Sequence, residues 1–222
     1  MVSLISYTTA PTILKPEQEL EELITYCARV SNPLSQATLM NSTKLIKYLI
    51  EHKHWSPFEM ASVCLEINTT RDIARQILRH RSFNFQEFSQ RYADPTQDLG
   101  FSLKEARMQD ITNRQNSIEN LDLDLELNWV IKQKAVLNLV KETYSWAISK
   151  GLAKEVARGI LPEGLTNSKL YMNGTIRSWI HYLEIRTAME TQKEHRLIAY
   201  ECLNQLGKVF PSIYPILKSK EQ

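Results

Sequence analysis

The sequence has few cysteines, and none of them are spaced like metal ligands. Cys27, Cys64 and Cys202 are the three cysteines of the chain, and they form no CxxC motif. An odd number of widely separated cysteines indicates neither a disulfide framework nor a zinc knuckle. We therefore expect free, buried thiols in a reducing compartment.

Long apolar runs are also missing, and we expect no leader. No window approaches the ~18 apolar residues that a membrane-spanning helix needs. The first six residues, MVSLIS, lack the basic start and long apolar stretch of a signal peptide. These absences favour a cytoplasmic protein without a membrane partner.

The chain also lacks a large excess of one charge. Its formal net charge is +2, and 23% of its 222 residues are charged. A protein that binds nucleic acid through its phosphates usually has a larger basic excess, so we expect anion binding here to be local. Hydrophobic residues make up 43% of the chain, which is enough for a proper core, and no repeat or low-complexity linker divides it. We predict a single domain over residues 1–222.

Hydrophobic periodicity predicts a helix-rich α+β fold with a small mixed or antiparallel sheet. Alternation of Val63, Leu65 and Ile67 with polar neighbours predicts a half-buried strand over 61–68. Thr191 and Glu194 have the spacing of a capping box. Strands are further expected at 2–7 and ending near 170–172, and a long surface loop within 93–120. Helices are expected at 16–29, from Ser42 onward, from Thr69 or Thr70 to about 81, and at 123–149, 153–160, 174–188 and 191–209.

Five arginines and no lysine lie between residues 71 and 91. Arg71, Arg75 and Arg79 have the i, i+4, i+8 spacing of one helix face, where like charges cost a few tenths of a kcal/mol per pair. The rigid fork of arginine matches phosphate or carboxylate. Two explanations follow from the spacing: an anionic ligand, or an internal network with carboxylates such as Asp72 and Glu87.

The surrounding motifs favour the ligand. Residues 79–92, RHRSFNFQEFSQRY, resemble the signature of the flavin-dependent thymidylate synthases. Four further segments look like parts of that family: ARVS at 28–31, HKHWSPFE at 52–59, EVARGILP at 155–162 and RSWIHYLEIR at 177–186. The order and spacing of these segments match those of the family from about residue 25 to 205. Residues 93–150 contain no recognisable motif of the family.

The resemblance implies an α+β homotetramer whose active sites are shared between subunits. It implies bound FAD, reduction by NADPH, and 5,10-methylenetetrahydrofolate as the one-carbon donor. The substrate would be dUMP, methylated to dTMP with no protein nucleophile on the base. Small molecules, and not nucleic acid, are the expected partners.

The same resemblance assigns roles to individual residues. Arg186 is the expected catalytic residue, because a fixed cation beside the uracil ring stabilises the charge that develops there. A guanidinium cannot act as a base at neutral pH, so its role is electrostatic. The dUMP ligands would be Gln76, Arg79, Glu87, Phe88, Ser89, Gln90, Arg91, Arg158 and Arg186. FAD would contact Ser56, Arg79, His80, Arg81, Glu87, Thr175, Arg177 and His181, with His54 at the folate and flavin entrance.

Two other functions compete with this one. Residues 71–92 could form a basic groove with stacking aromatics that binds single-stranded nucleic acid. His52 and His54 could hold a metal for phosphate hydrolysis, but two histidines at i, i+2 share no helix face, and no metal is predicted. The chain also departs from many relatives of the resembled family at Glu190, where they carry histidine. A carboxylate there would repel flavin phosphates or pair with an arginine.

Overall fold

The computed structural model describes residues 1–10, 20–31, 34 and 42–218 and confirms an α+β fold. Its sheet has the strand order β1-β2-β6-β3, and every pairing is antiparallel. These strands are β1 Val2–Tyr7, β2 Ser62–Thr70, β3 Asn84–Glu87 and β6 Asn167–Thr175. Of the two sheet types predicted, the antiparallel one is present. Within the described residues, no helix is long and apolar enough to cross a membrane.

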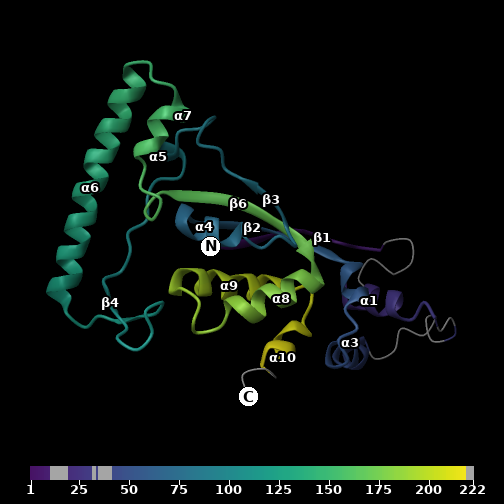
Figure 1. Ribbon diagram of the computed structural model, residues 1–222. Coiled ribbons are helices and arrows are strands. Elements are labelled where there is room, and N and C mark those ends of the chain that lie inside the picture. The colour runs from purple at the N-terminus through teal and green to yellow at the C-terminus, as the bar shows by residue number, and fades with distance from the viewer. Residues whose placement is uncertain (11–19, 32–33, 35–41, 219–222) are drawn as a thin grey trace.

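Helices cover the sheet and extend beyond it (Figure 1). α8 and α9 run beneath β6 in that view, whereas α7 lies above it and the long α6 stands away from the sheet. The helices are α1 Leu20–Ala28, α3 Ser42–Glu51, α4 Arg71–Ile77, α5 Pro95–Asp98, α6 Leu123–Ser149, α7 Lys154–Ala157, α8 Ile176–Arg186, α9 Lys193–Leu206 and α10 Ile213–Lys218. Single 3-10 turns lie at η1 Ser56–Glu59 and η2 Arg158–Ile160, and a hairpin pairs β4 Arg107–Gln109 with β5 Ser117–Glu119.

The central strand β2 confirms the alternation seen in the sequence. Val63, Leu65 and Ile67 are each 0% exposed, while the residues between them are partly exposed. β2 pairs along its whole length with β6, which runs from Ser62↔Thr175 to Thr70↔Asn167. A half-buried strand with one apolar face is therefore the base on which α8 and α9 pack.

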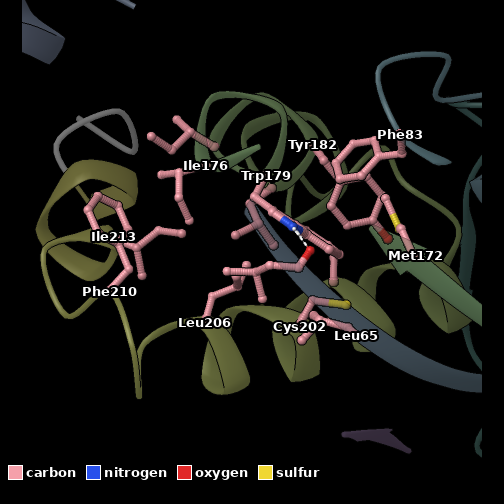
Figure 2. Packing of buried hydrophobic residues seen from close by; sticks show 14 of the residues in the cluster. Leu65, Phe83, Met172, Ile176, Trp179, Tyr182, Cys202, Leu206, Phe210 and Ile213 are labelled. Atoms are coloured by element: carbon pink, nitrogen blue, oxygen red, sulfur yellow. Dashed lines mark hydrogen bonds between the residues drawn. The ribbon is translucent and has the colours of Figure 1, made fainter. Parts of the chain in front are cut away.

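Trp179 ties α8 to this strand. Its indole Nε1 donates a 3.0 Å hydrogen bond to the carbonyl oxygen of Val63, and its ring meets Phe83 at 4.8 Å and Tyr182 at 5.8 Å between centroids. Figure 2 shows these rings with Cys202 of α9 in one packed cluster. Trp179 satisfies its polar group inside the core, as a buried indole requires.

Several element boundaries differ from the predictions. The helix expected to reach residue 81 ends at Ile77, because the chain must turn there to bury Phe83 and pair β3 with β6. Gly174 belongs to β6 and not to a helix, which begins at Ile176. The predicted helix over 16–29 is present from Leu20, and residues 16–19 lie outside the described part.

Caps and loops also differ. The predicted capping box is wrong, because Gln192 is the N-cap of α9 and the Thr191 hydroxyl donates to the Ile185 carbonyl. Thr70 is the N-cap of α4, but its hydroxyl bonds the Asp72 side chain and not a backbone N–H. The segment 93–120 contains α5 and the β4–β5 hairpin as well as loop, and α10 was not predicted.

Candidate active site

Two of the three stacked arginines are neutralised by carboxylates of their own chain. Arg75 forms a fork on Glu163, with hydrogen bonds of 2.5 Å from Nε and 2.9 Å from a terminal nitrogen. Arg71 lies 3.4 Å from Glu163 and 3.6 Å from Glu87. The hydrogen bond from Arg75 lowers the pKa of the Glu163 carboxyl. The internal network is therefore the correct explanation for this pair; Glu87 takes part in it, whereas Asp72 pairs with neither arginine.

Arg79 and Arg81 differ from the pair on α4. They lie in the turn between α4 and β3, so the predicted helical stack of three is wrong at its third member. Both are exposed, and neither forms an ion pair within the residues that the structure describes. Uncompensated guanidinium groups in a turn are suited to an anionic ligand.

His80, between these two arginines, meets the predicted catalytic residue. Arg186 is the last residue of α8, and its Nε donates a 2.9 Å hydrogen bond to Nε2 of His80. Burial, and then the charge of Arg186, lower the pKa of His80 to about 4. The imidazole is therefore neutral near pH 7 and carries its proton on Nδ1, because Nε2 accepts from the guanidinium. Arg186 itself pairs with no carboxylate in the described part of the chain.

Gln76 belongs to a partly buried network that the sequence did not indicate. Its Oε1 lies 3.2 Å from Nδ1 of His195, and its Nε2 donates to Gln192 at 2.8 Å. The other ring nitrogen of His195 lies 3.1 Å from the Tyr182 hydroxyl. The available signal was the position of His195 one turn before Ile198, on the apolar face of α9, where a histidine must find partners.

A second group of predicted residues lies after β3. The Phe88 backbone bonds Lys169 of β6, and the Arg91 backbone N–H donates to the Ser89 hydroxyl at 3.4 Å. Gln90 is 4% exposed, and its buried Nε2 has no hydrogen-bond partner among the residues that the structure describes. A buried donor without an acceptor costs about 1–3 kcal/mol, which a ligand acceptor would offset.

Arg91, a member of this second group, contacts α7. Its guanidinium lies 3.4 Å from Glu155, and both residues line a small cavity of about 190 Å³ together with Tyr92, Ala153 and Lys154. Arg158 is the C-cap of the same helix. In Figure 1, α7 and α8 lie on opposite sides of β6. Across the described residues, no hydrogen bond or ion pair joins Arg91 or Arg158 to Arg186.

The predicted FAD residues at η1 and α8 are brought together. Thr175 caps α8, accepting from the Ser178 N–H at 3.3 Å, and Arg177 in the first turn pairs with Glu59 of η1. His181, one turn further, packs edge-on against Trp55 with ring centroids 4.6 Å apart. Ser56 begins η1, and His54 is exposed just before it. These residues lie on two elements that contact one another.

A larger cavity of about 390 Å³ lies elsewhere. Residues from the end of β2, from 99–107 and from the start of α9 line it, and none of the predicted site residues is among them. Its three cations are already paired: Lys193 with Glu105 at 2.7 Å, Arg107 with Glu194 at 2.7 Å, and Lys104 with Asp72 at 3.3 Å. This cavity therefore offers no free charge for a phosphate.

The metal hypothesis gains no support from His52 and His54. The described residues contain no group of three or more histidine, cysteine or carboxylate side chains that could hold a metal ion. The His52 ring stacks on Tyr48 at 4.0 Å, and its Nδ1 lies 2.9 Å from the Tyr48 carbonyl oxygen. Glu190 is exposed and forms no ion pair in the described region, so pairing with an arginine is not its role in one chain.

Comparison with known proteins agrees with the motifs. Residues 5–212 match the family described as thymidylate synthase complementing protein. The chain is 50% identical over 193 residues to a probable flavin-dependent thymidylate synthase of Paramecium bursaria Chlorella virus 1, covering 87% of this chain and 88% of the viral one. It is 47% identical over 212 residues to a flavin-dependent thymidylate synthase of Synechocystis, covering 95% and 96%.

A solved structure shares the fold. The crystal structure of a UMP/dUMP methylase from Streptomyces cacaoi, bound with 5-Br UMP, superposes with a TM-score of 0.81 at 23% identity, covering 99% of this chain and 93% of that one. At this identity the likeness concerns the fold alone.

Proposed function

This chain belongs to the thymidylate synthase complementing proteins, the flavin-dependent thymidylate synthases, and we propose that it methylates dUMP to dTMP. Methylenetetrahydrofolate would supply the carbon, and NADPH would supply the reducing equivalents through FAD held at this site. No side chain attacks the base. The observation that carries the proposal is the contact of Arg186 with His80, which joins the predicted catalytic residue to the arginine-rich turn over 106 positions of sequence.

Arg186 acts on the uracil ring as a fixed cation. Carbon 5 must become electron-rich to take the methylene, and a neighbouring guanidinium favours the ionised form of the base. Because a guanidinium holds its protons at neutral pH, Arg186 cannot remove the N3 proton itself. The hydrogen bond to His80 leaves the other N–H groups of Arg186 for the base, and Gln76 helps to orient the nucleotide.

The donors present fit a flavin nucleotide. Arg79 and Arg81 have no internal counter-ion among the described residues, and neutral His80 offers Nδ1–H. Ser56 of η1, Thr175 at the start of α8, Arg177 and His181 would extend this donor set. Glu87 would add an acceptor, and His54 would lie at the entrance to the site. FAD held by these residues would supply the reducing hydride.

Arg91 and Arg158 would hold the dUMP phosphate, with Phe88, Ser89 and the unpartnered amide of Gln90 as further ligands. Arg91 pairs with Glu155 of α7 and Arg158 caps that helix, whereas Arg186 ends α8, which lies on the other side of β6 in Figure 1. A complete site therefore takes the two groups from different subunits.

We propose a homotetramer for this reason, and the surface of α6 supports it. Large apolar side chains along this helix are exposed, among them Leu127 at 59%, Leu139 at 64% and Trp146 at 57%. Exposed apolar surface of this extent is typical of a subunit interface. A single domain over 1–222 and a cytoplasmic location stay predictions.

The test of the function is direct. The purified protein should be yellow, dUMP should change its flavin spectrum, and dUMP with methylenetetrahydrofolate and NADPH should yield dTMP by chromatography. Arg186→Ala should keep the flavin and lose about 10²–10³-fold in dTMP formation, whereas the control Arg114→Ala on the hairpin loop should be unaffected. A colourless protein that makes no dTMP would end the proposal.

Mixing two inactive variants tests the shared site. Arg91→Ala and Arg186→Ala would be unfolded and refolded together, so that subunits exchange. If each site takes Arg91 and Arg186 from different subunits, roughly one quarter of the sites become intact in an equal mixture. No recovered activity would place both residues in one chain's site.

A further inference from the structure

His195 is a buried polar residue that the proposed chemistry does not use. It is 0% exposed and lies on the face of α9 that also buries Ile198, Ala199 and Cys202. Both of its ring nitrogens nevertheless have partners, Tyr182 on one side and Gln76 on the other. Since Gln76 is a proposed nucleotide ligand, this contact connects the core to the substrate site.

A chain of hydrogen bonds runs from Tyr182 through His195, Gln76 and Gln192 to Glu194. The Glu194 carboxylate fixes which group donates and which accepts in each of these bonds. Glu194 can only accept, and it takes bonds from Arg107 at 2.7 Å and from Gln192 Nε2 at 3.0 Å. Gln192 therefore turns its oxygen toward Gln76, whose Nε2 donates to it at 2.8 Å.

The same logic sets the tautomer of His195. With its nitrogen engaged by Gln192, Gln76 presents its oxygen to His195 Nδ1 at 3.2 Å, so Nδ1 must carry the proton. Nε2 then accepts from the Tyr182 hydroxyl at 3.1 Å. Every bond from Tyr182 to Glu194 points the same way, and no member has a second arrangement that satisfies all of them.

We infer that His195 is a positioning residue for the nucleotide site, whose imidazole holds the carboxamide of Gln76 in one orientation. Gln76 retains one free N–H and one free oxygen lone pair for a ligand. Without His195 the carboxamide keeps only its hydrogen bond to Gln192, so its plane can turn about that single contact and its free N–H and oxygen lose their fixed directions. A nucleotide would then meet the correct pair of groups for only part of the time.

The protonation states of this network stay constant under working conditions. Burial, and then the charge of Arg186, lower the pKa of His195 to about 3, and burial raises the pKa of Tyr182 well above its ordinary value. Tyr182 also lies edge-on to His80, with centroids 4.9 Å apart, so the network reaches the partner of Arg186.

The inference rests on the proposed function, and dUMP affinity measured by titration calorimetry tests it without turnover. His195→Leu should weaken dUMP binding about tenfold, the loss of one buried hydrogen bond. His195→Asn should restore most of the affinity, because its amide nitrogen replaces Nδ1. His195→Gln places its amide near Nε2 and should not restore it. Flavin content and melting temperature are recorded for each variant.

A merely structural histidine gives another pattern. The melting temperature would fall in all three variants while dUMP affinity stayed equal, and this result would overturn the inference. In the Gln76→Leu background, His195→Leu should cause no further loss of affinity; an additive loss would also overturn it. If His195→Leu fails to fold, the comparison of Asn with Gln decides. Wild-type protein that binds no dUMP would instead refute the proposed function.

Discussion

Replacing Gly174 with alanine would place a methyl group inside an aromatic cluster. A Cβ at this position would lie 2.3 Å from Cδ1 and 2.6 Å from Cε1 of Phe83, far inside ordinary contact distance. The φ angle of Gly174 is not positive, so the backbone itself tolerates alanine and the effect is steric. Phe83 cannot move away easily, because it is 7% exposed and its ring packs against Trp179 and Tyr182.

We expect Gly174→Ala to lower the free energy of unfolding by about 1–3 kcal/mol, the usual cost of overpacking a core. At about 2–4 °C per kcal/mol for a chain of this size, the melting temperature should fall by about 2–12 °C. Urea denaturation followed by circular dichroism measures the change. Because Phe83 ends the turn that carries Arg79 and Arg81, a displaced ring should also reduce flavin content.

The matched control is Gly159→Ala, where a Cβ meets nothing within 4 Å. This variant should unfold within about 0.5 kcal/mol of the wild type. A smaller side chain at residue 83 should relieve the clash, so Gly174→Ala combined with Phe83→Leu should cost less than the sum of the two single changes. The steric reasoning is refuted if Gly174→Ala is as stable as the control or if the costs simply add.

Three further results are expected. Trp179→Phe should cost about 1–3 kcal/mol in urea denaturation, because the buried Val63 carbonyl loses its donor; an unchanged midpoint would mean that water replaces the indole. Arg91→Lys should weaken dUMP binding in calorimetry through loss of the fork, and equal affinity would count against a phosphate contact. Burial lowers the pKa of His80 to about 4 and that of His195 to about 3, whereas an exposed histidine has a pKa of about 6.5. Below pH 6.5 the unfolded chain therefore binds more protons than the folded chain. Stability should therefore fall as the pH drops from about 6.5 toward 4, and a urea midpoint that stays constant over this range would contradict the burial of neutral rings.

Sequence patterns correctly predicted the helices and strands that have a strong hydrophobic periodicity or clear signals at their ends. The long helix 123–149 begins and ends where it was expected, capped by Asp122 and followed by Gly151 with positive φ. The strand β2 was found from its alternation, and β1 lies at the predicted residues 2–7. The resemblance of five sequence segments to known motifs predicted the family. The order of these segments along the chain can be read without knowing how they pack.

Long-range contacts decided what the local patterns could not. α4 ends before Arg79 because Phe83 must reach the core beside Trp179, a residue almost one hundred positions later. The capping box at Thr191 failed because α9 begins one residue later than predicted, with Gln192 as its N-cap. For α4, a distant partner overrode a local helix preference that is small by itself.

For the candidate site, too, the sequence determined some features and the tertiary structure determined others. The sequence by itself determined the chemical types present, namely arginine forks, a histidine between two of them, and Arg186 on a later helix. Only the tertiary structure decided that Glu163 neutralises Arg71 and Arg75, that His80 meets Arg186, and that His195 holds Gln76. The physical reason is that a residue's chemistry is carried by its own side chain, whereas its charge state and orientation depend on neighbours that folding brings from far along the chain.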